Sequence, residues 1–167
     1  RNMPNAVIFG PAQFGGMEFP EVQTLQDQVQ LMYLIRTLRW DKITANDVIT
    51  VLDSYQLATG FVAAVLFNPE IPINYVSDGW FPHIRRRLAS INGRIAIGDA
   101  WQPKLQRMGD DSIMEVFSAC TELKPKERLL ANEFRIWLRV ICISDLTDLD
   151  GVGIDLSKLQ GEWQATP

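Results

Sequence analysis

The sequence predicts a mainly α-helical protein, a single compact, bundle-like domain of about five helices with one or two short strands. The first observation is composition: 47% hydrophobic and 22% charged residues in a chain of 167 are typical of a globular domain with a core. The second is that apolar residues recur at steps of three and four along several segments, the period of an amphipathic helix. The third is that proline and glycine pairs fall between these segments.

Residues 1–20 are predicted to form an ordered junction before the first long helix. The segment runs from Met3-Pro4 through a turn at Gly10-Pro11 to the pair Gly15-Gly16. Two consecutive glycines indicate either a positive φ or a close approach of backbone that a side chain would prevent. We therefore expect a defined conformation here.

A helical domain is predicted over residues 21–143. In residues 21–39 the apolar positions follow the helical period: Val22, Leu25, Val29, Met32, Ile35 and Leu38. Residues 44–47 resemble a capping box, and the apolar residues after them fit one helix face if the helix runs through Gly60. Asn68-Pro69 would end that helix.

The middle of the chain predicts an extended connection over 68–76 and two further helices. Ser77 or Asp78 would cap the first, in which Pro82 is tolerated because it lies in the first turn. Residues 94–97 alternate like a short strand, and Asp110-Asp111 would start the next helix.

Pro125 opens the last predicted helix, which we expect at the centre of the core. Its apolar residues form one broad face: Leu130, Phe134, Trp137 and Ile141, widened by Ile136, Val140 and Ile143. Residues 144–167 read as an acidic, turn-rich tail.

The composition argues against several classes of protein. Cys120 and Cys142 indicate reduced core residues, and a single histidine, His83, argues against a structural zinc site. No signal peptide and no apolar stretch long enough to span a membrane are visible, so we expect an intracellular (cytoplasmic or nuclear) protein. No cofactor or small-molecule ligand is indicated. A start at Arg1 rather than Met predicts a fragment of a longer protein.

The net charge of −4 argues against a general nucleic-acid coat protein, but the charges are segregated. Acidic residues gather at the end of the chain: Asp145, Asp148, Asp150, Asp155 and Glu162. Basic residues gather between 80 and 107 and are the candidate nucleic-acid contacts: Arg85, Arg86, Arg87, Arg94, Lys104 and Arg107. The guanidinium groups of Arg85, Arg86 and Arg87 could pair with phosphates. The aromatic residues near them in sequence, Trp80, His83 and Trp101, could stack on bases. The alternative, favoured for a run of charges, is that the arginines form the solvated side of a helix.

Two acidic motifs could suggest metal sites. Gly109-Asp110-Asp111 matches a polymerase signature, but no apolar strands flank it, so we interpret it as a helix start. Residues 145–151 resemble a calcium loop in which the first and last ligand positions fail, so we interpret them as an acidic turn. With one histidine, no catalytic triad can be assembled.

Three blocks resemble the region downstream of the reverse transcriptase domain in non-LTR-retrotransposon-like polyproteins of microbial eukaryotes. They are residues 3–20 with Gly15-Gly16 at the centre, residues 101–114, and residues 143–155. In that family the catalytic Tyr-x-Asp-Asp lies upstream, so the resemblance assigns no catalytic residue here. The parent polymerase would use Mg²⁺.

The resemblance implies a non-catalytic thumb- or connection-like segment, with the upstream polymerase domain of the same polyprotein as its partner. RNA and DNA are candidate partners, and by position and charge the stretch 85–107 would contact the template-primer. The alternative is a helical protein-interaction or structural module without a nucleic-acid role. Exposed apolar surface would indicate a missing partner domain.

Overall fold

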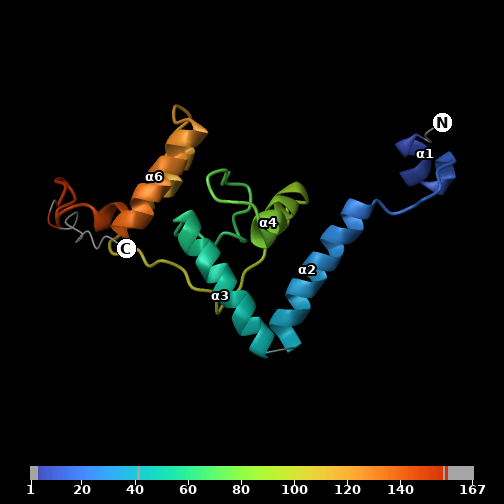
Figure 1. Cartoon of the computed structure of the whole chain (residues 1–167), viewed down its shortest axis with the longest axis horizontal. Coiled ribbons are helices and arrows are strands. Elements are labelled where there is room, and N and C mark those ends of the chain that lie inside the picture. The colour runs from blue at the N-terminus through green and yellow to red at the C-terminus, as the bar shows by residue number, and fades with distance from the viewer. Residues whose placement is uncertain (1–3, 41, 156, 158–167) are drawn as a thin grey trace, which may run out of the picture. The chain divides into compact units, whose positions relative to one another are not determined.

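The computed structural model describes residues 4–40, 42–155 and 157 (Figure 1). The helices are α1 (Asn5–Phe9), η1 (Ala12–Phe14), α2 (Val22–Trp40), α3 (Lys42–Thr59), α4 (Trp80–Ser90), α5 (Ile113–Ala119), α6 (Pro125–Leu138) and η2 (Ile143–Asp145), where η marks 3-10 helices. Apart from two isolated bridges, no β-strand is present in this part of the chain, so the mainly helical fold class is confirmed.

The chain divides into two compact units, Arg1–Val48 and Ile49–Pro167, which we describe separately. The sequence predictions that fall on Met3 and Glu162 lie outside the described residues. Within the ranges given above, no helix combines the length and the apolar character needed to cross a membrane.

In unit 1 the Gly-Gly pair closes an ordered turn, and both consequences predicted for it are confirmed. Gly15 has a φ of +80°, and a Cβ atom on Gly16 would lie 1.9 Å from the carbonyl oxygen of Gly10. The chain leaving the pair is hydrogen-bonded to α1, because the amide of Met17 donates to the Val7 carbonyl at 2.8 Å. Residues 4–20 therefore form a compact turn before α2.

The helix predicted over residues 21–39 is confirmed as α2. Five of the six apolar residues of its predicted stripe are exposed: Val22, Leu25, Val29, Met32 and Ile35. Two pairs of side chains within the helix support it. The side-chain amide of Gln23 donates to the carboxylate of Asp27 at 3.0 Å, and the guanidinium of Arg36 lies 5.7 Å from the ring centroid of Trp40.

The predicted helix through Gly60 is wrong at both ends. α3 begins at Lys42, so Thr44 lies inside the helix and is not its N-cap. It ends at Thr59 because Gly60 takes a left-handed conformation, with φ of +70°, and its amide returns to the carbonyl of Gln56 at 3.2 Å. Left-handed glycine after the last helical residue is the common way to end a helix.

The end of α3 is held by α6 through a buried arginine. The Nη2 atom of Arg135, a side chain only 3% exposed, donates to the carbonyls of Leu57 at 2.8 Å and Ala58 at 3.2 Å. The side-chain amide of Asn132, one turn earlier in α6, also donates to the carbonyl of Ala58 at 3.1 Å. A cation at this end of a helix is favoured by the helix dipole.

Two more segments complete the same helix end. The hydroxyl of Tyr75 donates to the carbonyl of Thr59, and the hydroxyl of Ser112 donates to the carbonyl of Gly60, each at 2.8 Å. Burial raises the pKa of Tyr75 above its usual range, so its hydroxyl keeps the proton that it donates. Four successive carbonyls are thus paired with side chains from three other segments.

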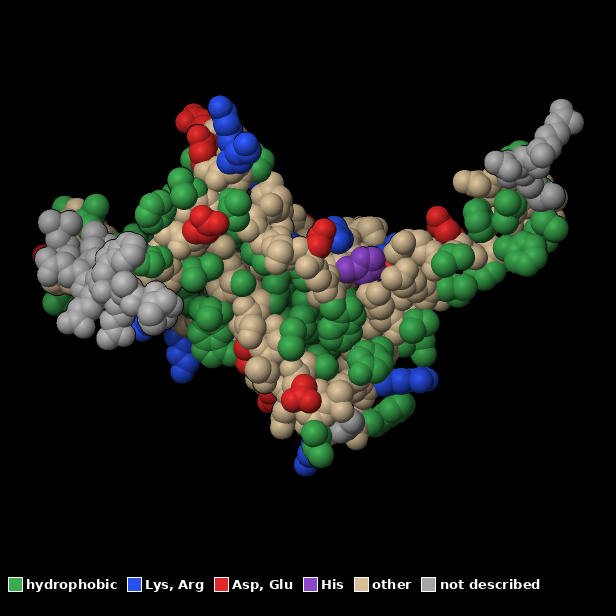
Figure 2. Space-filling model, viewed as in Figure 1, with side chains coloured by type: hydrophobic (Ala, Val, Ile, Leu, Met, Phe, Trp, Pro, Cys, Tyr) green, Lys and Arg blue, Asp and Glu red, His purple; other side chains and the backbone are tan. Residues whose placement is uncertain are grey.

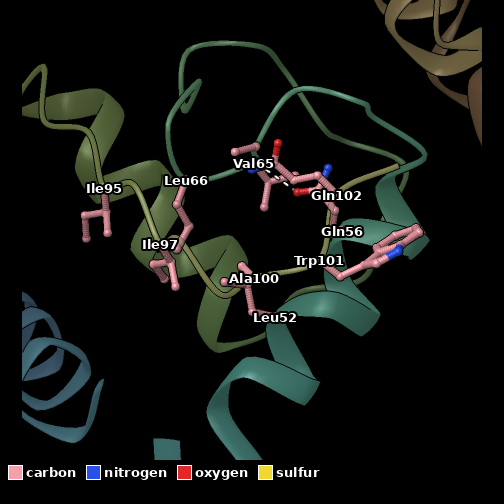
Figure 3. Close-up of a pocket in the computed structure, with 10 residues that line it drawn as sticks. Leu52, Gln56, Val65, Leu66, Ile95, Ile97, Ala100, Trp101 and Gln102 are labelled. Atoms are coloured by element: carbon pink, nitrogen blue, oxygen red, sulfur yellow. Dashed lines mark hydrogen bonds between the residues drawn. The ribbon is translucent and has the colours of Figure 1, made fainter. Parts of the chain in front are cut away.

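Gln56 organises the loop that follows α3. Its Nε2 atom donates to the carbonyls of Phe61 at 2.7 Å and Ala63 at 3.0 Å, and its Oε1 atom accepts from the amide of Val65 at 3.0 Å. Figure 3 shows Gln56 and Val65 joined beside a small cavity. The loop is therefore a hydrogen-bonded extension of the core, although it contains no regular helix.

The next helix, α4, starts without the predicted cap. Its N-cap is Gly79, with no side-chain bond, so neither Ser77 nor Asp78 caps it. Pro82 lies in the first turn, as predicted. Residues 94–97 form no strand; only the amide of Ile95 bonds across, to the carbonyl of Leu66 at 3.0 Å.

The predicted face of the last helix is wrong. In α6 the apolar side chains Leu130, Phe134 and Trp137 are 53%, 57% and 50% exposed, whereas the polar Asn132 and Arg135 are buried. The physical reason is the bonding just described, because the side chains that reach the end of α3 must face it. The spacing of apolar residues within α6 carries no information about acceptor carbonyls in another segment, so it could not predict which face is buried.

Substitution of Arg135 by Met is expected to lower the free energy of unfolding by about 3 kcal/mol, because buried carbonyls lose their donor. The matched control is Lys126→Met in the first turn of α6, where the side chain is exposed and the change should be small. Urea unfolding followed by circular dichroism measures both. Equal midpoints for the two variants would contradict this account of α6.

Substitution of Gly16 by Ala is expected to open the turn of residues 4–20, because the new methyl group would collide with the Gly10 carbonyl. Overpacking of this kind costs about 1–3 kcal/mol. Hydrogen exchange at the amides of Met17 and Phe19, which bond to α1, should accelerate. Gly98→Ala, where nothing lies within 4 Å, is the control and should leave these rates unchanged.

Candidate nucleic-acid interface

The first candidate contact, Arg85, is a buried structural residue. It lies four residues after Phe81 and three before Leu88, on the face of α4 that packs inward. Its Nε donates to the carbonyl of Val65 at 2.9 Å, and its Nη2 donates to that of Asn68 at 2.8 Å and to that of Ile71. With 5% of its surface exposed, it cannot reach a duplex, and the interpretation of the three arginines as one surface is corrected.

Arg86 and Arg87 are on the outer side of α4. Arg86 is exposed and pairs with Asp78 at 2.5 Å, and the hydrogen bond from Arg86 holds the pKa of that carboxyl below its ordinary value. Arg87 is half-buried and donates to the hydroxyl of Ser90 at 3.3 Å. Both guanidinium groups are in reach of solvent. Exposed ion pairs of this kind contribute little to stability.

Arg94 and Lys104 are exposed on loops. The guanidinium of Arg94 lies 5.6 Å from the ring centroid of Phe67 and 3.5 Å from a carboxylate oxygen of Glu70. Lys104 has an exposed side chain. Arg86 and Arg94 therefore contact acidic residues of the same segment, 68–78, and flank it.

Arg107 is engaged by the C-terminal part of the chain. Its guanidinium donates to the hydroxyl of Thr147 and, at 3.4 Å each, to the carbonyls of Asp148 and Leu149. This arginine therefore holds a turn in place. The six basic residues are close in sequence but differ in environment. Arg85 is buried, Arg107 is bonded to the C-terminal turn, and the other four have side chains that are exposed or half-buried.

The aromatic residues near these cations differ in the same way. Trp80 is half-buried and packs against Phe81, with ring centroids 5.0 Å apart and planes tilted by 44°. His83 is half-buried as well. Trp101 is exposed, and its backbone amide donates to the carboxylate of Asp53 at 2.8 Å. Of the three aromatic candidates for base stacking, Trp101 has the most accessible ring.

The Gly109-Asp110-Asp111 motif is structural. Asp110 is buried, and its Oδ1 atom accepts from the backbone amides of Asp111 and Ser144, at 3.1 Å each, while Oδ2 accepts from the hydroxyl of Ser144. The following helix, α5, is capped by Ser112, whose hydroxyl accepts from the amide of Glu115 at 3.1 Å. The two acids therefore precede the cap rather than occupy the first turn, which corrects the predicted helix start.

The second and third blocks of the family resemblance lie side by side. The amide of Ile143 donates to the carbonyl of Asp111 at 3.0 Å. The pairing continues into the two residues before the third block, where Cys142 forms a bridge with Ser112 and the carbonyl of Ile141 accepts from the amide of Ile113 at 2.9 Å. Gln106 also donates to the carboxylate of Asp145. Burial raises the pKa of the Cys142 thiol to about 11, which favours the protonated thiol at neutral pH.

The acidic turn ends the described chain. Its residues 147 and 154 form a bridge, and the carboxylate of Asp148 accepts from the amides of Val152 and Gly153 at 3.2 Å each. Asp145 similarly accepts from the amides of Ile141 and Cys142 at 2.8 Å. These carboxylates bind backbone, and no group of three or more potential metal ligands occurs within the described ranges.

The sequence contained a signal for the buried role of Arg85. Its spacing from Phe81 and Leu88 is that of an apolar helix face, so a helical wheel separates it from Arg86 and Arg87. The role of Asp110 had no comparable signal, because its partner Ser144 is 34 residues away. The chain matches no protein-family model, no curated protein and no solved structure.

Substitution of Arg85 by Met is expected to destabilise the fold by about 3 kcal/mol, since three carbonyls of the loop after α3 lose their donor. The neighbouring Arg86→Met variant removes an exposed pair and should change stability by less than about 1 kcal/mol. Chemical unfolding of both variants measures the difference. If Arg86→Met were the more damaging, the inward orientation of Arg85 would be refuted.

Proposed function

We propose that this chain is a non-catalytic, thumb- or connection-like segment of a reverse transcriptase-like retroelement polyprotein. The observation that carries the proposal is the pairing of the second and third resemblance blocks, in which the amide of Ser144 donates to Asp110 and the amide of Ile143 donates to the carbonyl of Asp111. The residues that the blocks single out are thus the ones that hold two distant stretches together. Such residues are expected to recur wherever this fold recurs, which supports a common fold for the blocks.

Within this proposal, contact with the template-primer depends on the exposed cations. Arg86, Arg94 and Lys104 have exposed side chains and Arg87 is partly accessible, whereas Arg85 is buried and Arg107 holds the tail. Phosphate contacts made by such side chains position a duplex without reading its sequence. The expected binding is therefore weak, independent of sequence and sensitive to salt.

A specific observation favours the second function, a helical protein-interaction module. The exposed residues Leu130, Phe134 and Trp137 recur at steps of four and three, so they lie on one side of α6. An exposed apolar row of this kind commonly marks a surface that another protein covers. In the first proposal, that protein is the upstream polymerase domain.

The two functions differ in their affinity for an RNA–DNA hybrid. If the chain contacts the template-primer, fluorescence anisotropy with a labelled hybrid should give an affinity that falls steeply with salt, with a logarithmic slope of about −0.9 for each phosphate contacted. The variant R86Q/R87Q/K104Q should bind more weakly and should show a slope less negative by about 2–3.

The matched control is R39Q/K42Q/K126Q, which removes the same charge from exposed positions outside the candidate surface. It should retain most of the affinity. Equal losses in both triple variants would mean that net charge alone acts. An absence of hybrid binding by the folded chain would refute the nucleic-acid role and leave the interaction module.

A further inference from the structure

A second feature of unit 2 is a cavity between α4 and the segment before it. It has a volume of about 510 Å³ and is open to solvent on one side. Residues between 69 and 78 line one wall, and Tyr55 of α3 contributes to the lining as well. The lining residues of α4 are Pro82, Arg85, Arg86 and Ala89. Pockets for small ligands are typically about 300–1,000 Å³, so the cavity has the size of a binding site.

The inner part of this cavity carries a buried positive charge. Arg85 lines it, and two of the three guanidinium nitrogens, Nε and Nη2, donate to backbone carbonyls. Among the described residues, no group accepts a hydrogen bond from the third nitrogen, Nη1, and no carboxylate forms an ion pair with Arg85, although Glu70, which also lines the cavity, interacts with it electrostatically. A buried cation without an anionic partner is unfavourable, which accords with the lowering of its pKa by desolvation.

The acidic residues at the cavity are paired with other cations. Asp78 binds Arg86 at 2.5 Å, and Glu70 lies 3.5 Å from Arg94. Both pairs are exposed, at the solvent side of the segment, whereas Arg85 is 5% exposed. Arg85 is therefore the buried charge of the lining, while the carboxylates of the lining form ion pairs with Arg86 and Arg94.

The rest of the lining is mainly apolar. Three prolines and three branched aliphatic residues contribute to it: Pro69, Pro72, Pro82, Ile71, Ile73 and Val76. Asn74 adds one side-chain amide, and Tyr55 adds one phenol hydroxyl. Such walls suit a hydrocarbon body but give few donors to an ion as strongly hydrated as phosphate.

We propose that this cavity binds a small organic carboxylate, whose oxygen accepts from Nη1 of Arg85 and whose apolar body lies against Pro72 and Ile73. The charge-assisted bond supplies the anion that the buried guanidinium lacks. One free nitrogen suits one carboxylate oxygen. The site is independent of the nucleic-acid role, since it uses the arginine that the outer surface excludes.

Three probes test the proposal on the full chain by chemical-shift titration: benzoate, its uncharged analogue benzamide, and inorganic phosphate. Benzoate should shift the backbone amide signals of Ile73, Asn74 and Ala89. Benzamide should bind more weakly than benzoate, by a factor of about ten or more. Phosphate should leave these amides unchanged. No shift with millimolar benzoate, or equal binding of benzamide or phosphate, would overturn the proposal.

A pair of variants locates the site without touching Arg85. Ala89→Phe places a ring in the cavity and should abolish the benzoate shifts at Ile73 and Asn74. Ser90→Phe, at the next position but not part of the lining, should bind benzoate as the wild type does. Undiminished binding by Ala89→Phe would place benzoate elsewhere. If that variant fails to fold, the comparison of benzoate with benzamide still decides.

Discussion

The buried C-terminal end of α3 is the constraint on which unit 2 depends. A helix leaves its last four carbonyls without partners in the helix, and here Thr59 and Gly60 are buried, so side chains supply donors. Arg135, Tyr75 and Ser112 do so from three separate segments. Each bond fixes one segment against the helix end, and together they set the orientation of α6, the position of the loop at Tyr75 and the start of α5.

Arg135 and Arg85 share one physical solution. Each buried guanidinium is surrounded by backbone carbonyls rather than by a carboxylate, so its charge is dispersed over several dipoles. The consequence reaches the surface, because arginines used inside do not contribute to the outer positive charge. It also leaves Leu130, Phe134 and Trp137 of α6 exposed. Figure 2 shows apolar side chains at many places on the visible face of the molecule.

These features separate the two proposals for unit 2. The exposed cations and the apolar row of α6 are surface properties, suited to large partners that cover them. The cavity beside α4 is a concave site with one buried charge, suited to a small ligand. Arg85 links the fold to the cavity, since the same side chain supports the loop through two nitrogens and lines the cavity.

Much of the secondary structure was determined by the sequence alone. Apolar spacing identified α2, and Pro125 identified the start of α6. The pair Gly15-Gly16 indicated the turn, in which the Gly10 carbonyl leaves no room for a side chain on Gly16. What only the tertiary structure decided was which face of α6 lies inside and which arginines are available. The physical reason is that a periodic pattern records hydrophobicity, whereas these choices follow from carbonyls and hydroxyls in distant segments whose need for a partner exists only once the chain has folded.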